Sequence, residues 1–218
     1  MSTRERILRY MLLVIGLFFI GLGIAVVKHS NLGISPISSI ANVLSIKFPS
    51  LTVGTWLMFT NCLMILVQII ILKSKFKPVQ LLQFPVSLIL SVFTDFCLMF
   101  VTLIPCNTYI IRLLFVFASV FILALGISLT LISDTIVNVG EAFVDVFAKL
   151  LNKNFGTVKV VVDVGLVTIA SILSLLFFDF KIVGIREGTI ITATLTGFVV
   201  KWIIKNFKSP IIKLVTSK

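Results

Sequence analysis

The stretch Tyr10–Val27, YMLLVIGLFFIGLGIAVV, decides the fold class of this protein. It carries no charged residue and is close to the roughly 20 apolar residues that a helix needs to cross a bilayer core. Arg4, Arg6 and Arg9 precede it as in a signal peptide, but no small-residue cleavage site follows and more apolar runs do. We therefore interpret this stretch as a retained first transmembrane helix.

Comparable apolar runs recur along the whole chain. Of the 218 residues, 59% are hydrophobic and only 12% are charged, whereas water-soluble domains are about half apolar and a quarter charged. In lipid such runs must be helices, because a helix satisfies its own backbone polar groups within one segment. The sequence predicts an all-α integral membrane protein with about six long transmembrane helices, in the runs Tyr10–Val27, Leu51–Leu72, Val79–Ile104, Tyr109–Ser133, Phe155–Phe178 and Val183–Ile204.

Two shorter and more polar segments, Gly33–Ile46 and Thr135–Leu151, follow long runs that end in similar residues. Gly21–Ile24 (GLGI) recurs as Ala124–Ile127 (ALGI), an offset of 103 residues that points to an internal repeat. The chain is therefore predicted to be a single membrane domain of two repeated halves, residues 1–104 and 105–218. The same offset pairs Asn31, Ser35, Ser38 and Asn42 with Asp134, Asn138, Glu141 and Asp145, and with one residue of slippage it pairs Asn61 with Asp163.

The two short segments leave the number of spans open. If they are re-entrant, each half has three spans and the second half is inverted relative to the first, as in many transporters. If they cross, there are eight spans and the halves are parallel. The cluster Lys73, Lys75 and Lys77 lies on the side of the N-terminus only with six spans. The positive-inside rule therefore favours six spans, inverted halves, and both termini in the cytoplasm.

The polar positions of each short segment are spaced i, i+4, i+7 and i+11, which predicts one polar helix face. Carboxylates on such a face cannot point into lipid without a cost of several kcal/mol. We expect them to line a shielded central site, although a surface helix with its acids in water near Lys149 or Lys153 is the alternative. Asp163 could instead pair with Lys159, and Asp95 could make a hydrogen bond between helices. The candidate ligand-binding residues are Asn31, Ser35, Ser38, Asn42, Asn61, Asp95, Asp134, Asn138, Glu141, Asp145 and Asp163.

A polar and acidic site within a membrane suits a cation, an amine-bearing solute, or coupling to protons. The sequence thus predicts a secondary transporter or facilitator of a small solute, with cationic solutes favoured by the acidic face. The alternative is a membrane substrate-binding or regulatory subunit that does not transport by itself and acts with a partner. Both hypotheses require a small-molecule or ion ligand, and both leave open a homodimer or a partner subunit.

Other classes of function lack their usual residues. His29 is the only histidine, the three cysteines show no metal-ligand spacing, and no phosphate-binding loop of the Walker type occurs. The net charge of +11 comes from Lys and Arg near span ends, which indicates membrane orientation rather than nucleic-acid binding. We expect no enzyme activity, no cofactor, no metal and no nucleic-acid partner.

Several short motifs resemble the bacterial YczE/YitT-type multi-pass membrane proteins. They are Gly21–Ile24, Asn31–Pro36 (NLGISP), Glu187–Ile190 (EGTI) and Thr196–Gly197, and the resemblance runs through nearly the whole chain. A departure is Phe198, where proline is expected after Gly197. The resemblance implies a small protein of the bacterial plasma (inner) membrane built from duplicated halves. It implies no catalytic residue.

Overall fold

The structure is a computed structural model that describes residues 2–216. These residues form eight α-helices and three short 3-10 helices, and they contain no β-strand. In chain order the elements are α1 (Thr3–His29), η1 (Pro36–Ser38), α2 (Ser39–Lys47), α3 (Val53–Leu72), η2 (Lys73–Lys75), η3 (Pro78–Leu82), α4 (Gln83–Val101), α5 (Tyr109–Ser133), α6 (Val139–Leu151), α7 (Phe155–Phe177) and α8 (Glu187–Thr216).

Six of these helices, α1, α3, α4, α5, α7 and α8, are long and apolar enough to cross a membrane. The predicted all-α membrane fold is therefore confirmed. Helices α2 and α6 have 9 and 13 residues, which at 1.5 Å per residue gives about 14 and 20 Å against a hydrocarbon core of about 30 Å. They are too short to cross it, so the lengths fit six spans rather than eight.

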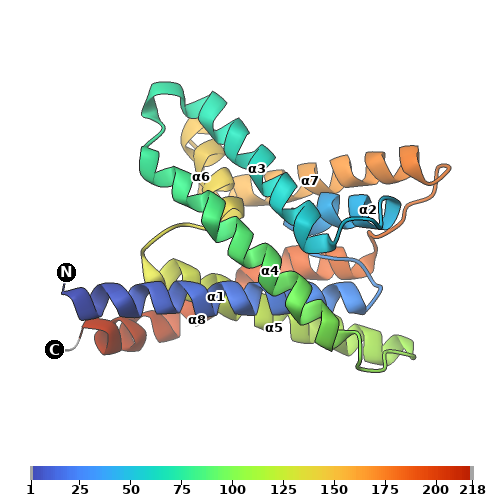
Figure 1. The fold of residues 1–218 in the computed structure, drawn as a ribbon, viewed down its shortest axis with the longest axis horizontal. Helices are drawn as coiled ribbons and strands as arrows, with labels where there is room; N and C mark the ends of the chain where they lie inside the picture. Colours follow the sequence, from blue (N-terminus) through green and yellow to red (C-terminus); the bar gives the residue numbers. More distant parts are fainter. Residues whose placement is uncertain (1, 217–218) are drawn as a thin grey trace.

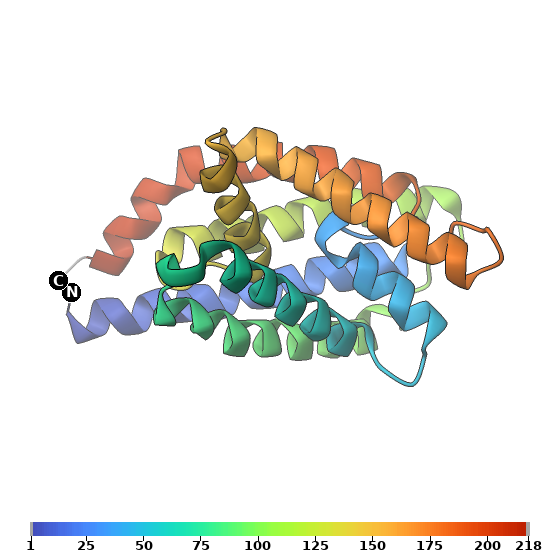
Figure 2. The same ribbon diagram turned by 90° about the horizontal axis from the view of Figure 1, so that it is seen from above.

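The long helices run back and forth between two ends of the molecule. Both termini lie at one end, α1 runs from there to the opposite end, and α5 runs back antiparallel to it (Figures 1 and 2). The short helix α6 lies toward the end that holds the termini, whereas α2 lies toward the opposite end. The two short elements therefore enter the bundle from opposite ends.

Close contact between α1 and α5 is made possible by glycine. A Cβ placed on Gly23 would lie 2.6 Å from Leu123 Cγ, and one on Gly126 would lie 2.6 Å from the backbone nitrogen of Ile20. Neither position has room for any side chain. Small residues at helix crossings let backbones approach closely, which is how helices gain packing energy inside a membrane.

The outer surface of the bundle is apolar. On α3, for example, Leu63, Leu66 and Ile70 are all more than half exposed and follow one another at i, i+3 and i+7. Such a stripe would be an aggregation hazard in water, but lipid chains can cover it. The helical periodicity thus separates a lipid-facing side from the buried side.

The helix boundaries correct one part of the polar-face prediction. Asp134 ends α5 in the left-handed conformation with φ 50°, and Asn31 follows α1 with φ 55°. A left-handed residue stops a right-handed helix, and Asn and Asp are the non-glycine residues that best tolerate it. The prediction of four polar residues on one face of each short helix is therefore wrong for these two positions.

Candidate binding site between the two short helices

A small cavity of about 60 Å³ lies where the two short elements approach each other from opposite ends of the bundle. Ile20, Ile24, Leu90, Leu123 and Ile127 from the long helices form much of its apolar wall. The volume suits a few water molecules or a small solute. Its polar lining comes from Ser35, Ser38, Asn61, Asn138, Glu141, Lys159, Asp163, Thr192 and Thr196.

Both short elements begin at this cavity. Ser35 precedes η1 with φ −61° and ψ 146°, and Asn138 precedes α6 with φ −59° and ψ 147°. Pro36 opens η1 as its first residue, where its missing N–H costs nothing. Because a helix start leaves N–H groups without an intrahelical partner, two helix starts bring polar backbone to the cavity wall.

Lys159 and Asp163 form an ion pair on one wall of the cavity. They lie one turn apart on α7, and Lys159 Nζ is 3.0 Å from Asp163 Oδ2 and 3.2 Å from Oδ1. The alternative interpretation of Asp163, a pair with Lys159, is what the structure shows. The pair lets a carboxylate stay inside the bundle, because an opposite charge offsets part of its desolvation cost.

Glu141 and Asn138 present buried oxygens to the cavity. Glu141 is only 5% exposed and Asn138 only 7%. Among the described residues, Glu141 Oε2, Asn138 Oδ1 and Thr196 Oγ1 are buried without a hydrogen-bond partner. A buried acceptor without a partner costs about 1–3 kcal/mol. Water or a ligand with hydrogen-bond donors would satisfy three such atoms around one cavity.

Six of the eleven candidate residues thus line one cavity, namely Ser35, Ser38, Asn61, Asn138, Glu141 and Asp163. Asp95 lies outside it and joins two helices: its Oδ1 accepts from Gly54 N at 2.8 Å, and its Oδ2 accepts from Thr52 Oγ1 at 2.6 Å. This is the hydrogen bond between helices that the sequence left open as an alternative.

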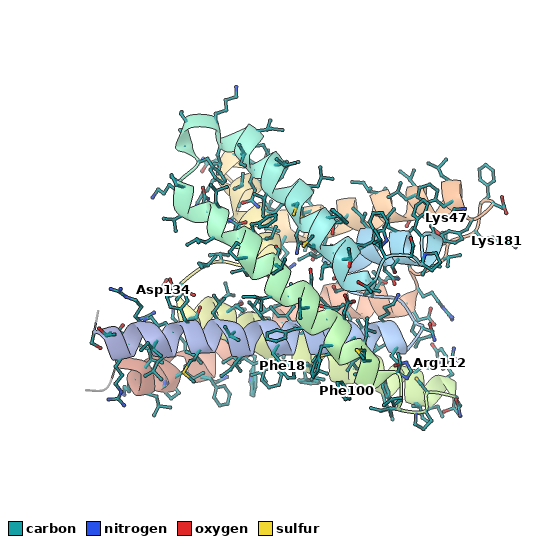
Figure 3. All side chains as sticks on the ribbon, in the orientation of Figure 1. Phe18, Lys47, Phe100, Arg112, Asp134 and Lys181 are labelled. Carbon is teal, nitrogen blue, oxygen red and sulfur yellow. The ribbon has the colours of Figure 1, made fainter. Side chains whose placement is uncertain are left out.

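The remaining four candidates lie toward the two ends of the bundle. Asn42 accepts a hydrogen bond from Lys28, and Asn31 is exposed. Asp134, with a side chain 88% exposed, lies at the end that holds the termini (Figure 3), 3.6 Å from Arg9. Asp145 is 45% exposed and pairs with Lys149. Asp145 therefore matches the alternative of an acid near Lys149 on a surface helix, whereas Glu141 on the same helix is buried.

Three polar residues of the cavity were not among the sequence candidates: Lys159, Thr192 and Thr196. A signal for the threonines was present in the sequence. Thr189, Thr192 and Thr196 are spaced i, i+3 and i+7 on α8, which places three hydroxyls on one face of an otherwise apolar helix. For Lys159 the sequence indicates only a pair with Asp163.

The described residues contain no cluster of three or more His, Cys, Asp or Glu side chains with the geometry of a metal site. Comparison with known proteins finds no curated protein and no solved structure that matches the chain. One family model, described as a family of unknown function (DUF6198), matches residues 7–205, which is most of the chain. By the extent of that match, the protein is a member of the DUF6198 family.

Proposed function

We propose that this protein is a secondary transporter or facilitator of a small cationic solute that binds in the central cavity. One observation carries the proposal: Glu141 Oε2 and Asn138 Oδ1 are buried in this cavity without a hydrogen-bond partner in the part of the chain that the structure describes. A solute with N–H donors, such as an ammonium or guanidinium ion, would satisfy both oxygens. Charge-assisted hydrogen bonds of this kind are about twice as strong as neutral ones.

The ion pair on α7 leaves Glu141, rather than Asp163, as the carboxyl group that would bind the solute. Asp163 already has a cation, because Lys159 Nζ lies 3.0 Å from its carboxylate. Glu141 forms no salt bridge within the residues described, so its carboxyl group is the one left to bind an incoming cation. Thr196 Oγ1 adds a third acceptor on the same cavity.

Matched contacts support two inverted halves related by the offset of 103 residues. Gly23 packs against Leu123, and Gly126 packs against Ile20. The offset takes Gly23 to Gly126 and Ile20 to Leu123. Each of the two contacts is therefore the other one with the two halves exchanged. A contact and its exchanged copy are what a two-fold relation between the halves would produce.

Backbone angles support the same relation at the short elements. Asn31 and Asp134 both have positive φ, and Ser35 and Asn138 share φ and ψ to within a few degrees. Helices α1 and α5, one from each proposed half, run antiparallel (Figure 1). Inverted repeats with half-length elements meeting at mid-depth are typical of secondary transporters.

The setting that we propose is the bacterial plasma membrane, with both termini cytoplasmic and with a relation to the YczE/YitT-type proteins. Lys73, Lys75 and Lys77 lie in the α3–α4 connection, at the end of the bundle that holds the termini (Figure 1). A basic cluster at that end supports a cytoplasmic location for it.

Solute uptake into proteoliposomes tests the proposal. Purified protein would be reconstituted, and entry of labelled methylammonium and guanidinium would be compared for the native chain, Glu141→Gln and Asp134→Asn. Glu141→Gln keeps the size of the side chain but not its charge, and Asp134→Asn is the matched control outside the cavity. We expect uptake by the native chain and the control, and loss of uptake in Glu141→Gln.

Absence of uptake for both cations would overturn the transporter proposal. Binding of either cation to the native chain without uptake would support the alternative, a membrane substrate-binding or regulatory subunit that needs a partner. Equal uptake by native and Glu141→Gln protein would reject the assigned role of Glu141.

A further inference from the structure

We infer that the cavity between α4, α5 and α6 is the entry vestibule through which a small cation reaches the central cavity, and that a cavity at the opposite end is its closed counterpart. This inference rests on the proposed function and adds to it a route, a direction of access in this conformation, and a charge preference for each end.

The vestibule has a volume of about 400 Å³. Helix α6 and the start of α4, which contribute to its lining, lie toward the end that holds the termini (Figure 1). Its walls come from the start of α4 and the segment before it, from the loop Thr135–Val137, and from α6. Glu141 lines both the vestibule and the central cavity. This buried carboxyl, with one oxygen lacking a partner, is therefore the junction between the two spaces.

The opposite end contains a cavity of about 330 Å³, lined among others by Lys28, Asn42, Gly184 and Arg186. Figure 3 shows its neighbours Lys47 and Lys181 at the end away from Asp134. None of the residues that line this cavity lines the central one. The central cavity thus shares Glu141 with the vestibule as a lining residue, and it shares no lining residue with this second cavity.

The two end cavities are built from equivalent positions. The offset of 103 takes Val79, Gln80 and Gln83 of the vestibule to Ile182, Val183 and Arg186 of the second cavity. The same offset links Asp145 to Asn42, and Ile136 to Gly33. Two inverted halves would place equivalent cavities at opposite ends of the bundle, as the two mouths of one pathway.

Hydrogen bonds close the second mouth. Lys28 Nζ donates to Asn42 Oδ1 at 2.6 Å, and Asn42 Nδ2 donates to Gly184 O at 2.9 Å, which joins α1, α2 and the loop before α8. The start of α8 is also fixed to the loop after α1, because Gly188 N donates to Leu32 O at 2.7 Å.

Within residues 2–216, no equivalent hydrogen-bonded bridge joins the elements around the vestibule. Asp145, the counterpart of Asn42, pairs with Lys149 on its own helix. Leu131, the counterpart of Lys28, has no group that could donate a hydrogen bond from its side chain. The start of α4 and the loop Thr135–Val137 therefore line an open space, whereas their counterparts are tied together.

The charged side chains that line the two mouths differ in sign, although Asp145 pairs with Lys149 and Arg186 pairs with Glu187. Glu141 and Asp145 line the vestibule, whereas Lys28 and Arg186 line the closed mouth. Acidic clefts with low-dielectric walls concentrate cations and raise their on-rates at least about tenfold. The open mouth thus favours the class of solute that the central cavity is suited to bind.

Cysteine labelling in sealed vesicles of both orientations tests this inference without requiring transport. The background protein has Cys62, Cys97 and Cys106 replaced by serine. Single cysteines are then introduced as Val137→Cys in the vestibule, Ile182→Cys at the closed mouth, and Ser38→Cys in the central cavity. Each is treated with a membrane-impermeant cationic methanethiosulfonate and with its anionic analogue.

We expect Val137→Cys to react from the face that holds the termini, about tenfold faster with the cationic reagent than with the anionic one. Adding Asp145→Asn should lower that ratio. Ile182→Cys should react from the opposite face and prefer the anionic reagent. Ser38→Cys should react faster from the Val137 face.

Faster reaction of Ser38→Cys from the Ile182 face, or equal rates from both faces, would overturn the inference. So would labelling of Val137→Cys and Ile182→Cys from the same face. If the labelling rates agree with these expectations but the protein shows no solute uptake, the inferred access route is supported and only the transporter proposal is rejected. A Ser38→Cys variant that fails to fold is replaced by Thr196→Cys on the same cavity.

Discussion

Lys159 and Asp163 lie one helical turn apart on α7, with Nζ 3.0 Å from Oδ2, and the Asp163 side chain is only 8% exposed. The pair is the one internal salt bridge that the described residues place on the central cavity. Lys159 pairs with Asp163, and Glu141 on the facing helix α6 keeps one oxygen without a hydrogen-bond partner among the described residues. The proposed site depends on this difference between the two carboxyl groups: Asp163 forms a salt bridge, whereas Glu141 has an oxygen that is free to bind the solute.

Removing the lysine should destabilise the protein. In Lys159→Met the buried Asp163 carboxylate loses its counter-charge, which costs 3–5 kcal/mol in fully buried pairs. Since the Lys159 side chain is 26% exposed, we expect a loss of about 2 kcal/mol. Thermal unfolding in detergent would measure it, and adding Asp163→Asn should restore most of the loss. No rescue by the double variant would show that the pair is not the cause.

Thr196→Val should separate stability from binding. The Thr196 hydroxyl is buried without a hydrogen-bond partner among the described residues. Replacing it with a methyl group of similar shape should therefore leave the melting temperature unchanged or raise it. Binding of guanidinium should weaken about fivefold, because one acceptor is lost. A lower melting temperature with unchanged binding would contradict the role that we give to this residue.

Asp95 should contribute to the stability of the fold but not to the affinity for the solute. Asp95→Ala removes the acceptor of the hydrogen bonds from Gly54 N and Thr52 Oγ1, and we expect a loss of about 1–3 kcal/mol in unfolding free energy. Methylammonium affinity of the folded protein should stay within about twofold of the native value, a change of about 0.4 kcal/mol. A selective loss of affinity at unchanged stability would place Asp95 in the binding machinery.

Two glycines give a matched test of the α1–α5 contact. Gly126→Ala should strongly destabilise the protein, because its Cβ would lie 2.6 Å from the backbone of Ile20. Gly165→Ala is the control on α7, where nothing lies within 4 Å of the added atom, and a helical alanine should stabilise by about 0.5–1 kcal/mol. Similar melting temperatures for the two variants would contradict the close crossing.

Much of the fold could be predicted from hydropathy, because only helices satisfy their backbone groups in lipid. The six long helices occur where the apolar runs predicted them, although α1 begins earlier, at Thr3, and α8 continues to Thr216. These extensions carry charged residues, and hydropathy cannot indicate helix that continues beyond the bilayer core.

The candidate site could be predicted only in part, because helix periodicity identifies a face but not where the helix starts. Asp134 and Asn31 share the polar spacing, yet each adopts a left-handed conformation at a helix end. Asp145 lies one turn beyond Glu141 on the same polar side and is about half exposed. Its burial depends on where α6 ends relative to its neighbours, which local sequence does not determine.

The central claim is that a small cation binds Glu141 in the cavity between the short helices, and ligand-induced thermal stabilisation tests it most directly. Guanidinium at about 100 times its dissociation constant should stabilise the native chain by about 2.7 kcal/mol, or roughly 5–10 °C in melting temperature. Asp134→Asn should show the same shift, and Glu141→Gln should show little or none. Equal shifts in the native and Glu141→Gln proteins, or no shift with guanidinium or methylammonium in the native chain, would contradict the account.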